Sequence, residues 1–374
     1  MKNQRIIIGI DVSKNTLDLI GVDLERNTII QPCVIENNTK SIRSWILRTQ
    51  KKWGQELEFA FENTGKYSFQ LAYELNEQKL VYFQLNALDV NRSKGIQRGK
   101  SDAADAMMIA QYTLSNRFKL KPSSMPTDTL IELKLLYTQR EKIVADIIKY
   151  SHISEDEATL PKRFLKNLKT INNSILNNLK KNLKKIENQI NEIIKEETEI
   201  AKNYKLIQSI PGIGPQTALY LILATKNFTT FKNARQLACY AGVAPFPYQS
   251  GTSIRGRNKV SPMADKKLKS LLNMCALTAK RTDKQLNAYW ERKIKEEKNK
   301  MLILNNIRNK LLSRVCSFNA CKYNKACKAL YDRIVAKGKS KKLALIAICN
   351  KLLKQAFAIV KNGIPYDNNY ASVL

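Results

Sequence analysis

The segment Arg5–Leu19, which reads RIIIGIDVSKNTLDL, constrains the fold more than any other stretch of the chain. It begins with a β-branched apolar run, residues 6–8, and reaches a single acid at Asp11. Such runs are typical of a strand that is buried on both faces. A carboxylate at the end of a buried strand is costly unless a positive group lies beside it, and a metal ion would be such a group. A second interpretation stays open, in which Asp11 only caps the turn into the next strand.

Residues 1–120 follow the order strand, strand, strand, helix, strand, helix, strand, helix. The expected strands are Arg5–Asp11, Leu17–Asp23, Ile29–Ile35, Leu57–Phe61 and Leu80–Leu85, and the expected helices are Thr39–Lys52, Ser68–Glu77 and Asp102–Asn116. Three successive strands followed by strand–helix alternation predict an α/β domain with a mixed sheet between helices. In that sheet we expect the first and fourth strands to be neighbours.

The remaining chain is predicted to be mainly helical. After a proline- and serine-rich linker at 122–126, apolar residues recur at helical spacing over 130–147 and again over 168–193, with an acidic break at Ser154–Pro161. This pattern predicts an antiparallel helical hairpin or coiled coil, which would act as a spacer or a dimerisation arm. A second globular region follows, with a polar loop up to Pro262 and helices at Gln285–Val315 and Lys341–Val360. We therefore expect three domains, 1–122, 123–203 and 204–374.

The net charge indicates the class of partner. The chain has 64 Lys and Arg residues against 32 Asp and Glu residues, a formal charge of +32 and a pI near 9.8. This excess points to a polyanionic partner, and binding that neutralises many phosphates is strongly salt-dependent. No apolar run approaches the roughly 20 residues that cross a bilayer, and residues 1–5 do not begin a signal peptide. We expect a cytoplasmic, nucleoid-associated protein that binds nucleic acid and no membrane.

Cysteine and histidine contribute little to the predicted chemistry. None of the seven cysteines forms a C-x-x-C pair, and His152 is the only histidine, so a structural zinc site is not expected. Small buried thiols in a reducing compartment explain the cysteines better. The histidine count also argues against Ser–His–Asp and Cys–His catalysis. Any catalysis would therefore depend on carboxylates, metal ions, hydroxyls and arginines.

Four acids form the first candidate site: Asp11, Glu62, Asp102 and Asp105. Glu62 follows the fourth predicted strand, and Asp102 and Asp105 lie three residues apart at the start of a helix, which places them on one face. Such a cluster could hold two Mg²⁺ ions about 4 Å apart for phosphodiester chemistry. Taken singly, Asp102 could be a helix N-cap, and Asp105 and Glu62 could be surface charges.

Three further segments could bind phosphate. The first is a basic stretch before the acidic pair, Arg92, Lys94, Arg98 and Lys100. The second is the PGIG turn with Gly212 and Gly214, which matches a helix-hairpin-helix pattern, although similar turns also end ordinary helices. The third is Tyr248–Pro262, a basic loop with two serines, Ser250 and Ser253, followed by Arg255, Arg257 and Lys259. A nucleophilic serine there has no visible base, but arginines and metal ions could stabilise the developing phosphoryl charge.

Several motifs in this chain resemble a known family in their order. The motifs are GIDVSKNTLDL, FENTG, RGKSDAADAMMIA, SIPGIGPQTA and ARQLACYAGVAPFPYQSGTSIRGR, followed by GKSKKLALIAICNKLL and YDNNY in the tail. Together they resemble the RuvC-like DEDD transposases of the one-ten insertion-sequence family, the bridge-RNA-guided recombinases. The resemblance spans nearly the whole chain, and its strength lies in the ordered set, because no single motif is decisive.

The resemblance implies an RNase H-like (RuvC-like) domain, a coiled coil and a C-terminal transposase domain. It places the metal-binding acids on Asp11, Glu62, Asp102 and Asp105, and the nucleophile on Ser250, with Ser253 as the alternative. It further implies Mg²⁺, a covalent phosphoserine link to DNA, a guide RNA encoded beside the gene, and a homodimer or homotetramer in which acids and serine could come from different chains.

Three other functions stay open on the sequence alone. They are a site-specific DNA invertase of the same architecture, a metal-dependent nuclease or junction resolvase in which water attacks, and a non-catalytic protein that binds DNA or RNA.

Overall fold

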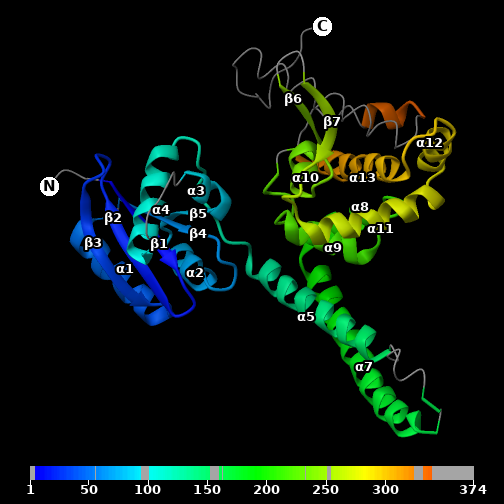
Figure 1. Ribbon diagram of the computed structural model, residues 1–374, viewed down its shortest axis with the longest axis horizontal. Coiled ribbons are helices and arrows are strands. Elements are labelled where there is room, and N and C mark those ends of the chain that lie inside the picture. The colour runs from blue at the N-terminus through cyan, green and yellow to red at the C-terminus, as the bar shows by residue number, and fades with distance from the viewer. Residues whose placement is uncertain are drawn as a thin grey trace. The chain divides into compact units, whose positions relative to one another are not determined.

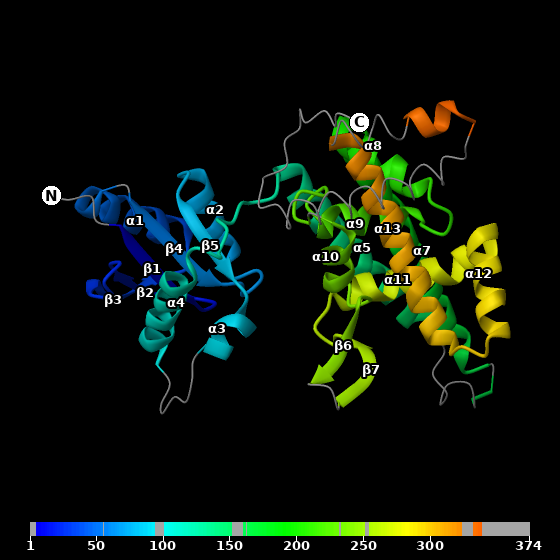
Figure 2. The ribbon, with the colours of Figure 1, turned by 90° about the horizontal axis from the view of Figure 1, so that it is seen from above.

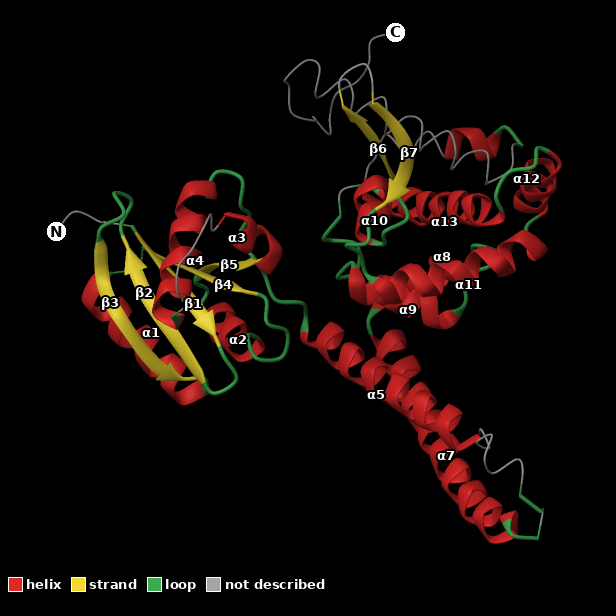
Figure 3. Cartoon of the chain, in the orientation of Figure 1, coloured by secondary structure: helices red, strands yellow, loops and turns green. Residues whose placement is uncertain are grey.

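The computed structural model describes residues 5–54, 56–93, 101–151, 160–161, 163–231, 233–250, 254–323 and 332–338. The chain divides into two compact units, Met1–Pro126 and Thr127–Leu374, called here the N-terminal unit and the C-terminal unit. The helices within these ranges are all too short or too polar to span a membrane. Figure 3 separates helices, strands and loops by colour.

The N-terminal unit contains a five-stranded mixed sheet. Its strands are β1 (Ile6–Val12), β2 (Thr16–Val22), β3 (Thr28–Glu36), β4 (Leu57–Glu62) and β5 (Val81–Leu85), in the order β3-β2-β1-β4-β5. The first three strands are antiparallel, whereas β4 lies parallel to both β1 and β5. The predicted mixed sheet and the predicted contact between the first and fourth strands are therefore confirmed.

Helices cover both faces of this sheet (Figures 1 and 2). On one face, α1 (Thr39–Trp53) and α2 (Phe69–Glu77) bury apolar side chains such as Ile46 and Leu75 against Ile8 and Phe59 of the sheet. On the opposite face, α4 (Asp102–Asn116) packs against β1 and β2. A short helix that was not predicted, α3 (Ala87–Ser93), follows β5.

The contact between α4 and β1 depends on a glycine. A methyl group on Gly9 would lie 2.1 Å from the carbonyl oxygen of Ala106 and 2.6 Å from the amide nitrogen of Ala110. Because both atoms belong to the helix backbone, they could not move without moving the helix. Gly9 therefore lets α4 lie closer to the sheet than any side chain would permit, as small residues do where two backbones approach.

The C-terminal unit is mainly helical. Its described elements are α5 (Asp128–Ser151), α7 (Leu165–Glu196), α8 (Thr198–Gln208), α9 (Pro215–Ala224), α10 (Ala234–Tyr240), β6 (Pro245–Ser250), β7 (Ile254–Val260), α11 (Lys266–Thr282), α12 (Lys284–Lys295) and α13 (Lys300–Tyr323). A single hydrophobic core includes residues from most of these helices, for example Ile222 of α9, Leu272 of α11 and Ile307 of α13.

The two long helices α5 and α7 pack side by side, as the amphipathic pattern predicted (Figure 1). Arg140 of α5 pairs with Glu187 of α7 at 2.9 Å, and Tyr137 shares a core with Ile194. The residue numbers of these pairs fall along α5, from 140 to 137, while they rise along α7, from 187 to 194, so the hairpin is antiparallel. Its base belongs to the core of the C-terminal unit, and a separate domain over 123–203 stays a prediction.

Two local predictions were wrong. The helix expected at Gln285–Val315 is broken into α12 and α13, because Glu297 adopts φ +54° and the Asn299 side chain accepts a hydrogen bond from the Met301 amide at 2.9 Å. Such a cap starts a new helix rather than continuing the old one. The polar loop expected up to Pro262 contains the antiparallel ribbon β6–β7. The helix expected at Lys341–Val360 lies outside the described residues.

Replacing Gly9 by alanine should destabilise the N-terminal unit by about 3 kcal/mol, because overpacking against a helix backbone cannot be relieved by a rotamer change. Gly21→Ala is the matched control. The three atoms nearest to its added methyl group all belong to the Ile30 side chain, at 2.8 to 2.9 Å, and this variant should cost about 1 kcal/mol. Hydrogen exchange of the α4 amides through a denaturant series measures both. Equal losses in the two variants would contradict a special role for the Gly9 contact.

Candidate metal-binding site

Three of the predicted acids come together at one edge of the N-terminal sheet. Asp11 lies near the end of β1, and Asp102 and Asp105 lie in the first turn of α4. One carboxylate oxygen from each residue lies within 4.8 Å of the other two. We call these residues the three-aspartate cluster.

The pleat of β1 and the turn of α4 explain this placement. Side chains alternate along a strand, so Gly9 and Asp11 share the face that α4 covers. Gly9 lies against Ala106 and Ala110, and one turn toward the helix N-terminus from Ala106 is Asp102. The close contact at Gly9 therefore sets the first turn of α4 over the end of β1, where Asp11 lies.

The capping roles that could have explained two of these acids belong to neighbouring serines. In the turn after β1, Ser13 Oγ accepts a hydrogen bond from the Thr16 amide at 3.0 Å. At the start of α4, Ser101 is the N-cap, and its Oγ accepts from the Ala104 amide at 3.3 Å. Asp102 is the first residue of the helix and not its cap. Neither the turn after β1 nor the N-cap of α4 therefore needs Asp11 or Asp102.

The cluster is electrostatically unfavourable by itself. Burial raises the pKa of Asp11, and so do the charges of Asp105, Asp102 and Asp18, against a smaller opposing effect of the hydrogen bond from the Val12 amide. The N-terminus of α4 contributes a partial positive charge, but like charges at this spacing still repel. An added cation would remove both the repulsion and the desolvation cost.

Glu62 lies on the same face but outside the cluster. It follows Phe61, which pairs with Ile10 of β1, so Glu62 and Asp11 occupy the same level on adjacent parallel strands. Ala60, two residues earlier, packs against Ile109 of α4, which places this register of β4 on the α4 side. Glu62 thus lies on the same face and at the same level as Asp11, but it is not among the three acids whose oxygens lie within 4.8 Å of one another.

One acid at this edge was missed by sequence reasoning. Asp18 of β2 is the direct cross-strand partner of Asp11. Burial raises its pKa, followed by the charge of Asp102. The turn geometry could have revealed it, since Asp11 and Asp18 are equally far from the centre of the Ser13–Thr16 turn.

The donor set suits a hard divalent cation. It consists of carboxylate oxygens with neither histidine nor cysteine among the grouped residues, and Mg²⁺ and Mn²⁺ prefer oxygen ligands. Three negative charges brought together by a strand and a helix, of which Asp11 and Asp102 have no capping role, fit such an ion. Mg²⁺ remains one choice among hard cations.

The predicted serine lies on the β6–β7 ribbon of the C-terminal unit. Ser250 is the last residue of β6 and pairs with Ile254, the first residue of β7. Arg255 pairs with Gln249, the neighbour of Ser250, and Lys259 is exposed near the other end of β7. Arg257 also lies on β7, and Ser253 lies outside the described residues. The ribbon therefore places Ser250 at its tip, next to a basic strand.

The base of this ribbon is held by Asp265. Its carboxylate accepts hydrogen bonds from the hydroxyls of Tyr220 at 2.9 Å and Tyr240 at 3.0 Å, and from the Leu268 amide at the start of α11 at 2.8 Å. Burial and the charge of Asp265 raise the pKa of Tyr240 to about 12, so this phenol stays a donor at neutral pH. Residues before and after the ribbon are thereby tied to one carboxylate.

The two glycines of the PGIG turn have different surroundings. Gly212 has φ +96°, and a methyl group there would lie 2.7 Å from the carbonyl oxygen of Cys275 in α11. The need for glycine at position 212 is thus explained by its close packing against α11. Gly214 caps α9, is exposed, and has open space where a side chain would be. Phosphate binding at both glycines stays a prediction.

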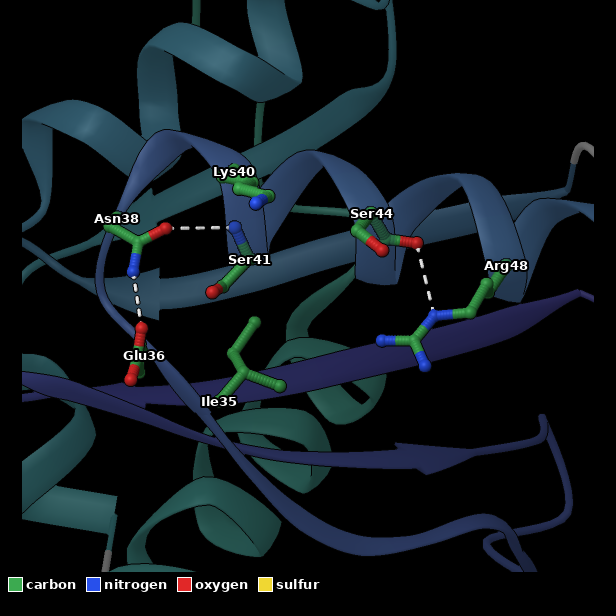
Figure 4. Close-up of a pocket in the computed structure, with 7 residues that line it drawn as sticks. All are labelled: Ile35, Glu36, Asn38, Lys40, Ser41, Ser44 and Arg48. Carbon is green, nitrogen blue, oxygen red and sulfur yellow. Dashed lines mark hydrogen bonds between the residues drawn. The ribbon is translucent and has the colours of Figure 1, made fainter.

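The remaining basic prediction cannot be placed, because Lys94, Arg98 and Lys100 lie outside the described residues, and only Arg92, in α3, lies within them. A surface depression between β3 and α1 is shown in Figure 4 and contains none of the predicted site residues. There the Asn38 side chain accepts from the Ser41 amide at 2.8 Å and donates to Glu36, so the polar groups complete a helix cap.

Comparison with known proteins gives matches along most of the chain. Residues 8–153 match a family model described as a transposase of the DEDD, IS110 type, and residues 204–291 match the Transposase IS116/IS110/IS902 family. A pilin gene-inverting protein of Moraxella bovis is 29% identical over 276 residues, which cover 72% of this chain and 81% of that protein. An insertion element IS110 protein of Streptomyces coelicolor is 34% identical over 88 residues, 23% of this chain and 21% of that one. Among solved structures, Thermus thermophilus RuvC with a Holliday junction substrate has 14% identity and a TM-score of 0.25, and the match covers 32% of this chain and 99% of RuvC.

Replacing Asp11 by asparagine should raise the thermal stability of the metal-free N-terminal unit at pH 7. Folding raises the pKa of Asp11 above its usual 3.8, so ionised Asp11 lowers the stability of the folded state. This loss of stability is complete above the raised pKa and absent below pH 3.8, where the carboxyl is protonated in both states. The gain over wild type should therefore shrink as the pH falls toward 3.8. Thermal unfolding in a chelator from pH 7 to pH 4 measures it, with the exposed helical acid Glu77→Gln as control. A loss of stability in Asp11→Asn at pH 7 would contradict the repulsion.

Proposed function

The chain belongs to the IS110 family of transposases, and on this basis we propose that it cuts and rejoins DNA at the ends of a mobile element through a covalent serine intermediate. The protein is a DNA transposase or recombinase, so its substrate is DNA. The observation that carries the proposal is the convergence of Asp11, Asp102 and Asp105 from two separate elements.

The acids would hold the divalent cation. Asp11, Asp102 and Asp105 provide the cluster, and Glu62 lies at the same level on the neighbouring strand. When bound, one or two Mg²⁺ ions would neutralise phosphate oxygens and stabilise charge that develops during displacement at phosphorus. Through such a cation, the carboxylates would position the scissile phosphate relative to the sheet.

Ser250 is the proposed nucleophile. Its Oγ forms a bond to phosphorus, the hydroxyl proton is lost, and the bond from phosphorus to one strand oxygen breaks, so that strand leaves as an alcohol after taking up a proton. A hydroxyl from another strand can then attack the phosphoserine and release Ser250. One phosphoester bond forms for each that breaks, so rejoining needs no nucleotide cofactor.

Cationic and backbone groups near these sites would hold the nucleic acid. Phosphate contacts fix the register of a complex without reading sequence. The residues that we assign to this role are Arg98, Lys100, Gly212, Gly214, Arg255, Arg257 and Lys259. We further propose an element-encoded guide RNA that selects the target by base pairing, and a homodimer or homotetramer that brings two strand-exchange sites together.

DNA inversion is the second candidate function. The relative from Moraxella bovis, which aligns with 72% of this chain, is described as a pilin gene-inverting protein. The same chemistry would serve both functions, because inversion and transposition differ in the arrangement of the recombining sites. A plasmid that carries two element ends in inverted orientation separates them: inversion leaves a single rearranged circle, and excision releases a second one.

Ser250→Ala should abolish the protein–DNA adduct. The assay incubates the protein with labelled element ends, the RNA transcribed beside the gene, and Mg²⁺, and detects the adduct on a denaturing gel. Ser253→Ala, only three residues away, is the matched control and should keep the adduct. The opposite pattern would move the nucleophile to Ser253. Normal cleavage in both variants would favour a hydrolytic nuclease in which water attacks.

Removal of divalent metal should stop the same reaction. Chelation, or Asp105→Asn, is expected to lower the rate of adduct formation by about a thousandfold, because metal ions contribute several kcal/mol of charge stabilisation. Binding of the DNA itself should persist, since the cationic residues do not depend on the acids. Undiminished adduct formation in chelator would remove the metal from the mechanism. Binding without activity under every condition would leave a non-catalytic nucleic-acid-binding protein.

A further inference from the structure

Three acidic residues form a row across the N-terminal sheet, and the middle one is Asp11. On one side, Asp18 of β2 is the antiparallel partner of Asp11. On the other side, Glu62 follows the β4 residue that pairs with Ile10. Paired residues on adjacent strands point to the same face, with Cβ atoms about 5 Å apart in an antiparallel pair. Asp18 and Glu62 therefore flank Asp11 at one level, beneath the first turn of α4.

The placement of Asp18 on the α4 side follows from its own strand. Val22, four residues further along β2, packs with Ile7 and Ala110 on the α4 side. Leu17 and Leu19, the neighbours of Asp18 in sequence, are buried on the opposite face with α1 and α2. Because side chains alternate along a strand, Asp18 shares the α4 side with Val22. Its position is thus set by the burial of the residues around it.

Within the described part of the chain, the Asp18 carboxylate has no hydrogen bond or ion pair, and its cross-strand neighbour is another acid, Asp11. Asp23, at the end of the same hairpin, shows the contrast. Its carboxylate is almost completely buried and accepts from the Asn27 amide at 2.8 Å, the Asn27 side chain at 3.0 Å and the Glu25 amide at 2.9 Å. Asp23 stabilises a turn, whereas Asp18 makes no such contact.

The nearby turn does not need Asp18 either. Ser13 accepts from the Thr16 amide, and the Ser13 amide donates to the Thr16 carbonyl at 3.0 Å, which closes the β1–β2 connection. An asparagine or threonine at position 18 would fit the same strand without the charge. A carboxylate that faces the three-aspartate cluster from the adjacent strand and has no structural contact of its own is better explained by a ligand absent from the free protein.

We propose that Asp18 is an outer carboxylate of the divalent-cation site, a positioning residue that raises the affinity of the site for the ion. This inference rests on the proposed metal site and extends it to a residue outside the four acids. Asp18 lies outside the group whose oxygens are within 4.8 Å of one another, so it acts by its charge and by accepting hydrogen bonds from water bound to the ion. Its partner is a hard divalent cation, Mg²⁺ or Mn²⁺.

The test measures Mn²⁺ binding by the full-length protein without nucleic acid, by calorimetry and by the paramagnetic resonance of free Mn²⁺. Asp18→Asn should weaken binding about tenfold, as loss of an outer carboxylate does at other metal sites. Asp18→Glu, which keeps the charge, should bind more tightly than Asp18→Asn. Glu77→Gln removes one exposed acid from α2 on the other face of the sheet and should bind as wild type does.

Thermal unfolding of the metal-free protein is the second measurement. If Asp18 had only a structural role, its replacement would lower the unfolding temperature. Asp18→Asn should unfold at a higher temperature than wild type, because a repulsive charge has been removed. Wild-type Mn²⁺ affinity in Asp18→Asn, or a lower unfolding temperature, would overturn the inference and leave the proposed function intact. Failure of the wild-type protein to bind Mn²⁺ would overturn the metal site and the inference together.

Discussion

The close contact between Gly9 and the backbone of α4 is the constraint on which the N-terminal site depends. Several carboxylates can bind one cation only if they lie within a few ångströms of one another, and their mutual repulsion tends to separate them. In this chain the apolar burial of β1 and α4 provides the force that opposes separation, and the missing side chain at Gly9 sets the distance. The three-aspartate cluster is therefore stabilised by atoms that carry no charge and lie one turn away from it.

The sequence was sufficient to predict the sheet and its acids, because the signals there are local and repeated. Alternating burial and β-branched runs give the strands, and their order gives the contact between β1 and β4. It was also possible in principle to find Asp18, since the length of the β1–β2 turn determines the cross-strand pairs. Asp18 belongs to no local motif, however, and it gains its significance from its partner Asp11 on the adjacent strand.

Other features could not be read from local signals. The β6–β7 ribbon has proline, glycine and several cations in its strands, a composition that is typical of loops, and its base is held by contacts of Asp265 with tyrosines on two other elements. The break between α12 and α13 interrupts a continuous helical pattern at Glu297. The close approach of α11 to Gly212, which leaves no room for a side chain there, also could not be read from the PGIG motif. Each of these depends on tertiary neighbours that composition does not specify.

The hydrogen bonds of the turn and of the helix start are accepted by Ser13 and Ser101, and not by the neighbouring Asp11 and Asp102. This arrangement has a consequence for copies of the gene that accumulate mutations. Under the proposed mechanism, an amide in place of Asp11 or Asp102 would stop the reaction while leaving the turn and the helix start in place. Under the same proposal, such a copy would still fold and still bind the ends of the element. Inactive descendants of the element would thus compete with active ones for the same DNA, and the element's own decay would restrain its spread.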